Sequence, residues 1–581
     1  MRRLAIRLGA GLAGLLLLLV LAGYGFLRGA APVLDGTRPL QGLSAKVSVE
    51  RDSLGVPVIT AESRADAARA LGFLHAQDRF FQMDLLRRVA AGELAELFGA
   101  AAVEFDEQHR LYRLRSVARQ VLARATPEQR AVLTAYSEGV NAGLKALGTW
   151  PFEYGVLLRR PRAWQPEDSI LVIDAMYFEL QDPADRRESN LAVMRELMTP
   201  ALYRFLAVTG TQWDAPVSGK APEMPPIPGA DVIDLRKRLP GATAAVATDS
   251  PESPWVLWLD SVPPGAIGSN NFAVSAAHGA DGHAILANDM HLGLRVPNIW
   301  YRAELRYRDA RAEGGQVAVT GVTLPGLPQI VAGSNRHAAW GYTNSYGDWV
   351  DLVELRLNPA DADEYLAPDG WRHFEHHTEF IRVKGGADAK LEVRDTLWGP
   401  VLDRDHAGVT RAVHWVAADP DATNLELEGI ERARDVREAM AVANRAGMPE
   451  QNFLTADSAG RIAWTIAGRI PVRQGYDPSR PSYWDKPGTG WSGWLPPEQY
   501  PRITDPDNGR LWTANARVVD GAMLAAVGDG GYDLGARAGQ IRDDLLGRDA
   551  LEPADLLAIE LDDRALFLAR WRTLLLALLN P

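Results

Sequence analysis

The chain has 581 residues, 47% of them hydrophobic and 23% charged, which is typical of a folded globular protein and excludes disordered and fibrous classes. Acidic residues outnumber basic ones by 74 to 62, and the resulting net charge of −12 argues against a nucleic-acid partner, which requires a basic surface. There is no cysteine, so disulfides, a cysteine nucleophile and thiolate metal ligands are excluded. A chain of this length is expected to form two or more lobes or one large multilayer domain.

The first 31 residues are typical of an export signal or a membrane anchor. Three arginines precede an uncharged run at 8–27 that is rich in leucine, alanine, glycine and valine, and such a run is long enough to cross a bilayer. The small residues at 29–31 follow Arg28 and form a poor cleavage site, so an uncleaved anchor and a removed signal peptide both stay open. We predict an exported, periplasmic protein that residues 8–27 could anchor to the inner membrane.

Four further segments follow along the chain. Alternating apolar and polar residues over 43–63 predict a pair of strands. From Arg64 to about Val208 apolar residues recur at helical spacing, which predicts a mainly helical segment. Residues 212–268 are rich in proline, glycine, alanine and serine, the composition of an exposed linker. From Asn271 short β-rich runs dominate, and 554–579 are predicted to form a final amphipathic helix.

The stretch PPGAIGSNNFAVS, residues 263–275, lies where the linker-like segment meets the first β-rich run. The sequence lacks the Gly-x-Ser-x-Gly elbow that would indicate an α/β-hydrolase nucleophile. Cutting the chain between Gly268 and Ser269 would instead give Ser269 a free α-amine, whose reference pKa of about 7.7–8.0 leaves an appreciable neutral fraction near physiological pH. By itself the tripeptide Gly268–Ser269–Asn270 is more typical of a turn, so the surrounding sequence has to decide.

Four separated motifs resemble the penicillin acylase family of amino-terminal-serine hydrolases. They are ALGFLHAQDRFFQMDLLRR at 70–88, GSNNFAVS with HAILANDMHLG at 268–293, LPGLPQIVAGSNRHAAWGYTNSYGDWVDLVEL at 324–355 and EQNFLTADSAGRIAW at 450–464. The resemblance runs in order from about Asp35 to the end of the chain. Agreement of four motifs is much more specific than any one of them.

The resemblance implies an α+β fold, the αββα sandwich of Ntn hydrolases, made as a precursor that matures into two subunits. The predicted segments are the signal peptide or anchor at 1–31, a mainly helical small-subunit segment at 32–211, a spacer at 212–268 and a β-rich large-subunit segment at 269–581. Large subunits of the family usually extend further, so this one is expected to be shortened at its C-terminus.

The resemblance also assigns catalytic roles. Ser269 corresponds to the nucleophile, and its new amino group to the general base. His291 corresponds to a histidine that hydrogen-bonds the terminal serine in some branches. The backbone N–H of Asn344 and the side-chain amide of Asn452 would bind the oxyanion, and Arg473 matches an arginine near the active site. An ordinary structural role stays open for each of these residues: a turn for Ser269 and the two asparagines, a hydrogen bond to a local backbone group for His291, and an exposed strand end for Arg473.

A structural calcium site is implied by GDWVDLVE at 347–354 together with RRESNLA at 186–192. Asp348, the Val350 carbonyl and Asp351 offer the hard oxygen donors that calcium prefers, and Glu188 matches the carboxylate from the small subunit that completes the family's site. The alternative is that these acidic residues are simply solvated. No organic cofactor is expected.

The acyl pocket is predicted from positions where the phenylacetyl-preferring branch carries bulky phenylalanines. The residues at pocket positions are Met176, Leu180, Leu292 and Ala332, and at the last three of them phenylalanine is replaced. Aliphatic and small residues favour a flexible fatty acyl chain over an aromatic ring. Core packing explains each of these residues equally well.

The sequence thus predicts an autoprocessed N-acyl amide hydrolase, acting on an acylated amine such as a β-lactam side chain or an N-acyl-homoserine lactone through an acyl-enzyme on Ser269. The alternative is a truncated or unprocessed, non-catalytic homologue that is membrane-anchored and binds acylated amides. A conventional Ser/His/Asp hydrolase is disfavoured because the nucleophile elbow is absent.

Overall fold

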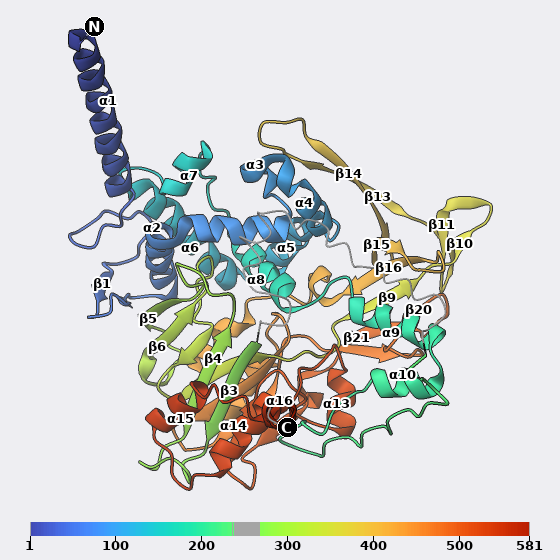
Figure 1. The fold of residues 1–581 in the computed structure, drawn as a ribbon. Coiled ribbons are helices and arrows are strands. Elements are labelled where there is room, and N and C mark those ends of the chain that lie inside the picture. Colours follow the sequence, from blue (N-terminus) through green and yellow to red (C-terminus); the bar gives the residue numbers. More distant parts are fainter. Residues whose placement is uncertain (1, 235, 238–267, 580–581) are drawn as a thin grey trace.

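The computed structural model describes residues 2–234, 236–237 and 268–579, which form a mixed α+β body with one long helix projecting from it (Figure 1). This helix, α1 (Arg2–Gly29), covers the predicted export segment. Within the described residues it is the one helix long and apolar enough to cross a membrane, over Ile6–Gly29, and none of that stretch is buried.

The segment predicted to be helical consists of helices that pack around α2 (Arg64–Ala91). Ser63 caps α2 by accepting a hydrogen bond from the N–H of Asp66. α6 (Pro127–Ala146) lies against α2 so closely that a Cβ added at Gly139 would be 2.0 Å from the carbonyl oxygen of Arg69. The other helices of this segment are α3 (Ala95–Phe98), α4 (Val103–Arg110), α5 (Leu114–Arg124), α7 (Phe152–Leu157), α8 (Pro166–Leu180), α9 (Arg186–Leu197) and α10 (Pro200–Leu206).

The largest sheet has nine strands, and its first two confirm the strand pair predicted for 43–63. In spatial order its strands are β1 (Ser48–Arg51), β2 (Pro57–Thr60), β5 (Tyr301–Arg308), β6 (Gln316–Thr323), β7 (Ala332–Ser334), β8 (Ala338–Asn344), β17 (Gln451–Asp457), β18 (Ile462–Ala467) and β22 (Arg502–Thr504). A three-stranded sheet, β23 (Arg510–Thr513), β3 (Gly268–Val274) and β4 (Ile285–His291), carries Ser269 on its central strand.

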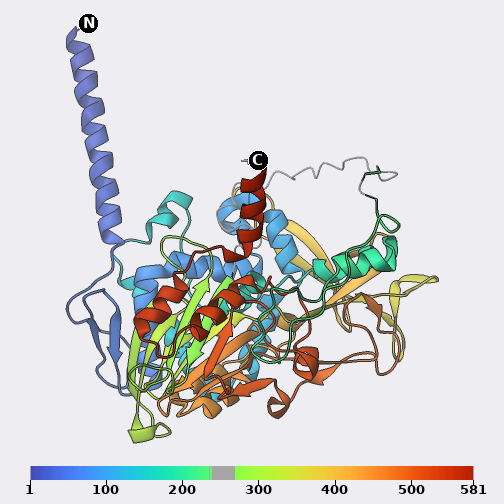
Figure 2. The same ribbon diagram turned by 60° about the horizontal axis from the view of Figure 1, so that its bottom comes forward.

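The two sheets lie face to face between helices (Figure 2). β3 and β4 contact β8 and β17 of the large sheet. α12 (Val436–Ala443) packs against β17 and β18, while α14 (Ala536–Leu546) packs against β23 and α15 (Pro553–Glu560) against β4. The order of the layers is therefore helix, large sheet, small sheet, helix. Ser269 lies on the central strand of the small sheet.

The remaining strands form a lobe beside this stack (Figure 1). A six-stranded sheet contains β13 (Glu375–Ile381), β14 (Ala389–Thr396), β15 (Gly399–Arg404), β16 (Thr410–Trp415), β9 (Val350–Glu354) and β20 (Ser482–Tyr483). Smaller sheets consist of β10 (Leu357–Asn358), β11 (Asp361–Ala367) and β12 (Gly370–His373), and of β19 (Pro471–Gln474) and β21 (Gly490–Trp494).

Two expectations are corrected. The final helix is broken into α15 and α16 (Ala569–Leu579), because the Asp562 carboxylate accepts a hydrogen bond from the N–H of Arg564 and turns the chain. The predicted linker at 212–268 is part of the core at its start. Ala215 is buried and its carbonyl accepts a hydrogen bond from the indole of Trp512 at 2.7 Å. Residues 235 and 238–267 of that linker lie outside the described residues.

Candidate active site

Ser269 is buried on β3, and both of its backbone polar groups are held by side chains. Its N–H donates to Oδ1 of Asn515 at 2.6 Å, and its carbonyl accepts from Nη1 of Arg537, also at 2.6 Å. A Cβ at Gly268 would lie 3.0 Å from Nη2 of Arg537 and 3.2 Å from Oδ1 of Asn515. The position before Ser269 therefore leaves little room for a side chain beside these two groups.

Asn515 connects Ser269 to the two asparagines predicted for the oxyanion site. Its Nδ2 donates to the carbonyl of Asn344 at 3.1 Å, and Nδ2 of Asn452 reaches the same carbonyl at 3.4 Å. Oδ1 of Asn452 accepts from the indole of Trp464 at 3.0 Å, which fixes the orientation of the amide and points its Nδ2 toward the Asn344 carbonyl. The structure thus brings Ser269, Asn344 and Asn452 together, all buried, although they lie far apart in the sequence.

Asn515 and Arg537 were missed by the sequence analysis. Asn515 has a left-handed backbone with φ of 65°, which asparagine tolerates better than most residues. Arg537 stands in the first turn of α14 and also contacts Asn270, Asn515 and Asp533. Burial lowers the pKa of its guanidinium, and the charge of Asp533 acts in the opposite direction. The one signal in the sequence for Asn515 is that asparagine is common at positions with a left-handed backbone. For Arg537 the sequence contains no such signal.

His291 ends β4 opposite Gly268, and Ser269 is paired with Met290. Because neighbouring residues of a strand point to opposite faces, the imidazole lies on the face of the sheet away from the Ser269 side chain. Its Nε2 is 2.7 Å from Oδ2 of Asp289 and 3.5 Å from Nδ2 of Asn270. In the described part of the chain no hydrogen bond joins His291 to Ser269, and the role of His291 at the serine stays a prediction.

Arg473 lies among the carboxylates predicted to bind calcium, and its side chain is partly buried, with 11% of its surface exposed. Its Nη2 donates to Oδ1 of Asp348 at 2.9 Å and its Nε to Oδ2 of Asp351 at 2.8 Å. Glu188, on α9, accepts from the N–H of Leu352 at 3.1 Å. Burial is the main cause that raises the pKa of Glu188 and of Asp348 well above the ordinary value, and the neighbouring acidic groups add to it.

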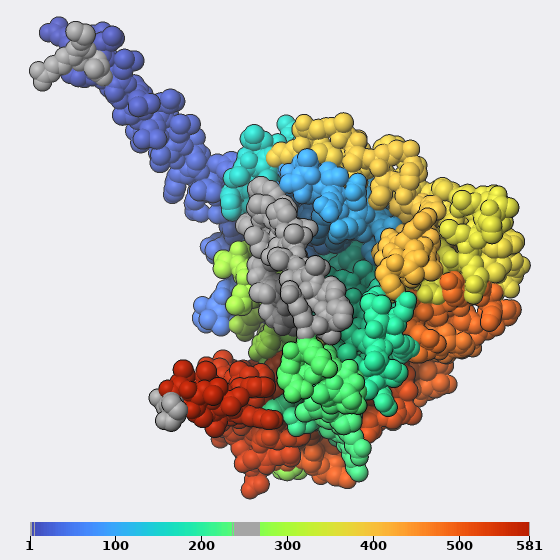
Figure 3. Space-filling view, turned by 45° about the vertical axis from the view of Figure 1, so that its right-hand side comes forward, coloured from blue at the N-terminus to red at the C-terminus, as the bar shows by residue number. Residues whose placement is uncertain are grey.

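A large cavity of about 1930 Å³ reaches from the helical segment to the edge of this site. Met176, Leu180 and Asn344 line it, and the carbonyl of Leu180 accepts from Nδ2 of Asn344 at 2.6 Å. Leu292 and Ala332 do not line it; both pack against the main hydrophobic core. Figure 3 shows a hollow on the face bordered by the blue helical segment and the yellow and orange strands.

Glu450, next to the Gln451–Asn452 pair, is a fully buried acid close to the site. Its Oε2 accepts from Nε2 of Gln181 at 2.6 Å, while Oε1 has no hydrogen-bond partner. Burial raises the pKa of its carboxyl group to about 8. Glu450 is therefore expected to be protonated in the native protein at neutral pH.

We expect the Glu450→Gln variant to lose part of the pH dependence of stability. The native pKa is raised above the unfolded value, so the unfolded chain releases the proton first and the free energy of unfolding falls as pH rises from about 4.5 to about 8. Glutamine cannot ionise and removes this contribution. Urea unfolding of the parent and of the Glu450→Gln variant at pH 5 and pH 8 measures the free energy of unfolding. If this free energy changes by the same amount between the two pH values in both proteins, Glu450 is not protonated in the native state.

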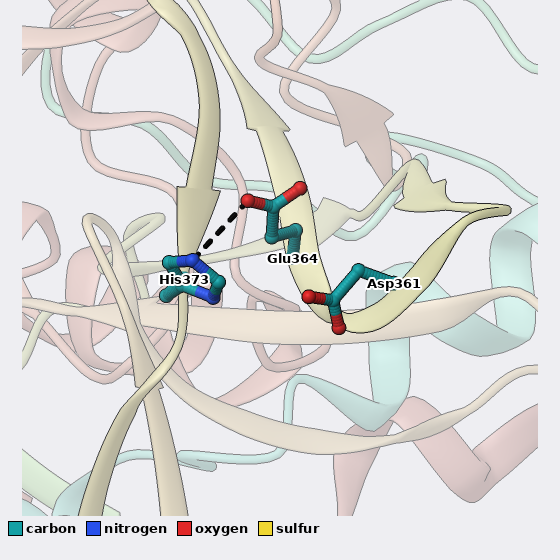
Figure 4. A group of neighbouring side chains, drawn as sticks. All are labelled: Asp361, Glu364 and His373. Atoms are coloured by element: carbon teal, nitrogen blue, oxygen red, sulfur yellow. Dashed lines mark ion pairs between the residues drawn. The ribbon is translucent and has the colours of Figure 1, made fainter.

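One further side-chain group has the spacing of a metal site. Asp361, Glu364 and His373 on the β10–β12 sheet are the only such group in the described ranges whose ligand atoms all lie within 4.8 Å of one another (Figure 4). Asp361 and His373 are exposed, and the imidazole of His373 is 3.3 Å from Glu364. Solvated ion pairing accounts for this arrangement.

Comparison with known proteins places these features in a family. The model of the penicillin amidase family matches residues 46–580. The chain belongs to this family. A penicillin acylase 2 proenzyme from Pseudomonas sp. strain SE83 is 32% identical over 85% of this chain and 61% of its own length. The acyl-homoserine lactone acylase QuiP of Pseudomonas aeruginosa is 28% identical over 93% of this chain and 63% of its own length.

The chain spans about three fifths of the length of the two relatives just named. Among solved structures, a thermostable penicillin G acylase from Alcaligenes faecalis is 23% identical, with a TM-score of 0.44 over 50% of this chain and 51% of its own. Family membership confirms the resemblance that the four motifs indicated.

Proposed function

We propose that the chain is an autoprocessed N-acyl amide hydrolase whose nucleophile is Ser269. The observation that carries this proposal is the hydrogen-bonded series from the Ser269 nitrogen through Asn515 to Asn344 and Asn452. The series holds the nitrogen atom that would become an amine after cleavage and connects it to Asn344 and Asn452, which supports the proposed role of these two residues as oxyanion donors. Relatives named penicillin acylase and acyl-homoserine lactone acylase support the reaction class.

In the proposed mechanism the α-amine of Ser269 takes the proton of Oγ as Oγ attacks the amide carbonyl carbon. The Asn344 N–H and the Asn452 side-chain amide stabilise the oxyanion. The protonated amine then gives its proton to the leaving nitrogen, the C–N bond breaks, and the acyl group is left as an ester on Oγ. Water attacks this ester with the amine again as base, which releases the acid and restores Ser269.

Maturation is proposed to divide the chain as the sequence suggests, with one change. The αββα sandwich is supported by the order of helix and sheet layers around β3. The small subunit is proposed to extend beyond residue 211, because Ala215 is in the core and the N–H of Val217 donates to the carbonyl of Val518. The spacer then begins after these residues and ends at Gly268. His291 would act at the serine only if the freed terminus moves toward it.

The proposed substrate class is a long-chain N-acyl amide, including N-acyl-homoserine lactones. Support comes from the aliphatic side chains of Met176 and Leu180 in the cavity that Asn344 also lines. A large and mainly apolar cavity has room for a flexible acyl chain.

The test of the proposal is a comparison of chain composition and substrate preference. On a denaturing gel the purified protein is expected to run as two chains, the larger one beginning with Ser269. In a panel of phenylacetyl, glutaryl and long-chain acyl amides, the long chains are expected to be hydrolysed fastest. A single intact chain that binds these amides without turnover would support the non-catalytic alternative, and a preference for phenylacetyl would reject the substrate class alone.

A calcium ion is proposed to bind at Glu188, Asp348, Asp351 and the Val350 carbonyl. The residues fit a cation, because Oε1 of Glu188 and Oδ1 of Asp351 are buried without a hydrogen-bond partner. Arg473 pairs with Asp348 and Asp351, and the negative charges of both carboxylates also act on Glu188. Since the carboxylate oxygens are not gathered within 4.8 Å of one another, the side chains would have to rotate to hold one ion. The ion would tie the two subunits together.

Calcium is expected to stabilise the protein by about 3 kcal/mol at a concentration 100-fold above its dissociation constant, and a chelator should remove this gain. Thermal unfolding with calcium and with EGTA measures the effect. Glu188→Gln should lose most of the difference, whereas Glu196→Gln, on an exposed part of the same helix, should keep it. Equal unfolding temperatures with and without calcium in the parent protein would argue against the site.

A further inference from the structure

The foot of α1 is joined to the body at the segment that leads into α7. The N–H groups of Gly148 and Thr149 donate to the carbonyl of Gly29 at 2.9 and 3.1 Å, and the Thr149 hydroxyl donates to the carbonyl of Phe26 at 2.7 Å. The ring of Phe26 lies against Gly155, where an added Cβ would be 2.8 Å from it. α7 is therefore held beside the end of the helix that can cross a membrane (Figures 1 and 2).

The surface of α7 exposes apolar side chains at this level. Trp150 is 41% exposed, Phe152 49%, Val156 76% and Leu158 86%; we call these four residues the α7 patch. Large exposed apolar side chains gathered in one short segment usually mark an interaction surface. Each of these four side chains keeps two fifths or more of its surface exposed in the described part of the chain.

Positive charge accompanies the α7 patch. Arg159 and Arg160 directly follow Leu158 and are exposed, and the Arg160 guanidinium lies 5.4 Å from the centre of the Trp150 ring. Arg28 in the last turn of α1 is also exposed. A tryptophan with neighbouring aliphatic and cationic side chains is the composition that favours the headgroup region of a bilayer containing anionic lipids.

The large cavity begins at the same place. Phe152 and Val156 of the α7 patch line it, as do the exposed Leu294 and Val296 of the loop after β4. At its other end the lining includes Met176, Leu180 and Asn344. One continuous cavity thus connects the segment beside α1 with the edge of the candidate active site.

We propose that the α7 patch lies in the headgroup region of the bilayer that α1 spans, and that the cavity takes long-chain N-acyl amides from that leaflet to Ser269. The first part rests on α1 and the patch alone, and the second rests on the proposed hydrolase function. A long acyl chain partitions into the bilayer at about 0.8 kcal/mol per CH₂ group. An entrance at the membrane surface meets the substrate where it is concentrated.

The absence of cysteine allows a direct test of the patch. A single Leu158→Cys substitution in the full chain carries a nitroxide spin label, and the protein is reconstituted in vesicles of phosphatidylcholine and phosphatidylglycerol. Asp369→Cys is the matched control. The Asp369 side chain is 61% exposed and lies in the turn between β11 and β12. Electron paramagnetic resonance compares access of oxygen, which dissolves in lipid, with access of a water-soluble nickel chelate.

The label at Leu158 is expected about 5–10 Å inside the headgroup boundary, with oxygen access above nickel access, and the control label in water. Equal access of the nickel chelate to both labels would contradict the proposal that the α7 patch lies in the bilayer. Recovery of a protein that lacks residues 1–31 would overturn it as well, because α1 must be retained.

The substrate route is tested with the double variant Trp150→Asp/Leu158→Asp, whose residues do not line the cavity. Hydrolysis of a long-chain acyl amide in vesicles is expected to fall at least about tenfold, since two charges oppose insertion, while a short-chain soluble acyl amide is cleaved at the parent rate. Leu397→Asp, at an exposed leucine elsewhere, should change neither rate. If the double variant hydrolyses the long-chain acyl amide at the parent rate, the proposed route of substrate from the bilayer through the cavity is wrong. If the parent protein hydrolyses neither substrate, the proposed hydrolase function is wrong. The depth of the spin label would still show whether the α7 patch lies in the bilayer.

Discussion

Replacement of Ser269 by alanine is expected to leave the chain in one piece and to reduce amide hydrolysis by roughly 10⁴-fold or more. Alanine lacks the Oγ that is proposed to attack the preceding peptide bond during maturation and the substrate carbonyl afterwards. The backbone contacts of position 269 with Asn515 and Arg537 involve only its N–H and carbonyl. They are kept in the variant, so the fold should survive.

Two measurements separate loss of chemistry from loss of structure in the Ser269→Ala protein. Mass spectrometry should give the mass of the uncut polypeptide, and its far-ultraviolet circular dichroism should match that of the parent. Ser275→Ala, at the residue just after β3, is the control and should mature normally. A Ser269→Ala protein that is cut at residue 268, or that still hydrolyses acyl amides, would show that another residue is the nucleophile.

The second large effect is expected at Asn515. Asn515→Ala removes the acceptor for the Ser269 nitrogen and the donor to the Asn344 carbonyl, so the amine and one oxyanion group lose their common support. We expect kcat to fall about 10²- to 10³-fold, as for loss of an oxyanion donor, with a smaller change in KM. Steady-state kinetics on a long-chain acyl amide measure it. A variant with an unchanged kcat would exclude Asn515 as a positioning residue.

Arg537 offers a readout that a purely structural role would not change. Its guanidinium contacts the Ser269 carbonyl and Asn515, and a nearby positive charge disfavours protonation of the amine that must act as base. In Arg537→Gln the acid limb of the pH–rate profile is therefore expected to move to higher pH. Arg542→Gln, farther along α14, is the matched control and should keep the parent profile. A profile that does not move would show that Arg537 has no influence on the base.

Local patterns were sufficient for much of the fold. The uncharged run at 8–27 predicted α1, and the helical periodicity after Arg64 predicted the segment around α2, because hydrophobic spacing is a property of neighbouring residues. The composition of 212–268 was misleading at its start. Burial of Ala215 depends on Trp512, which lies almost 300 residues later and supplies a contact that no local window contains.

The candidate site divides in the same way. The roles predicted for Ser269, Asn344, Asn452 and the acidic residues around 348–351 came from contiguous motifs that resemble those of the penicillin acylase family. Asn515 and Arg537 became visible only when β23 and α14 were packed beside β3. The position of His291 was likewise set by strand pairing, which puts it opposite Gly268 and on the other face from Ser269. A contiguous motif is a local property of the sequence, whereas the partner of a buried polar group depends on the packing of distant elements. For that reason Ser269 could be proposed as the nucleophile from the sequence, and its contacts with Asn515 and Arg537 became apparent only in the folded chain.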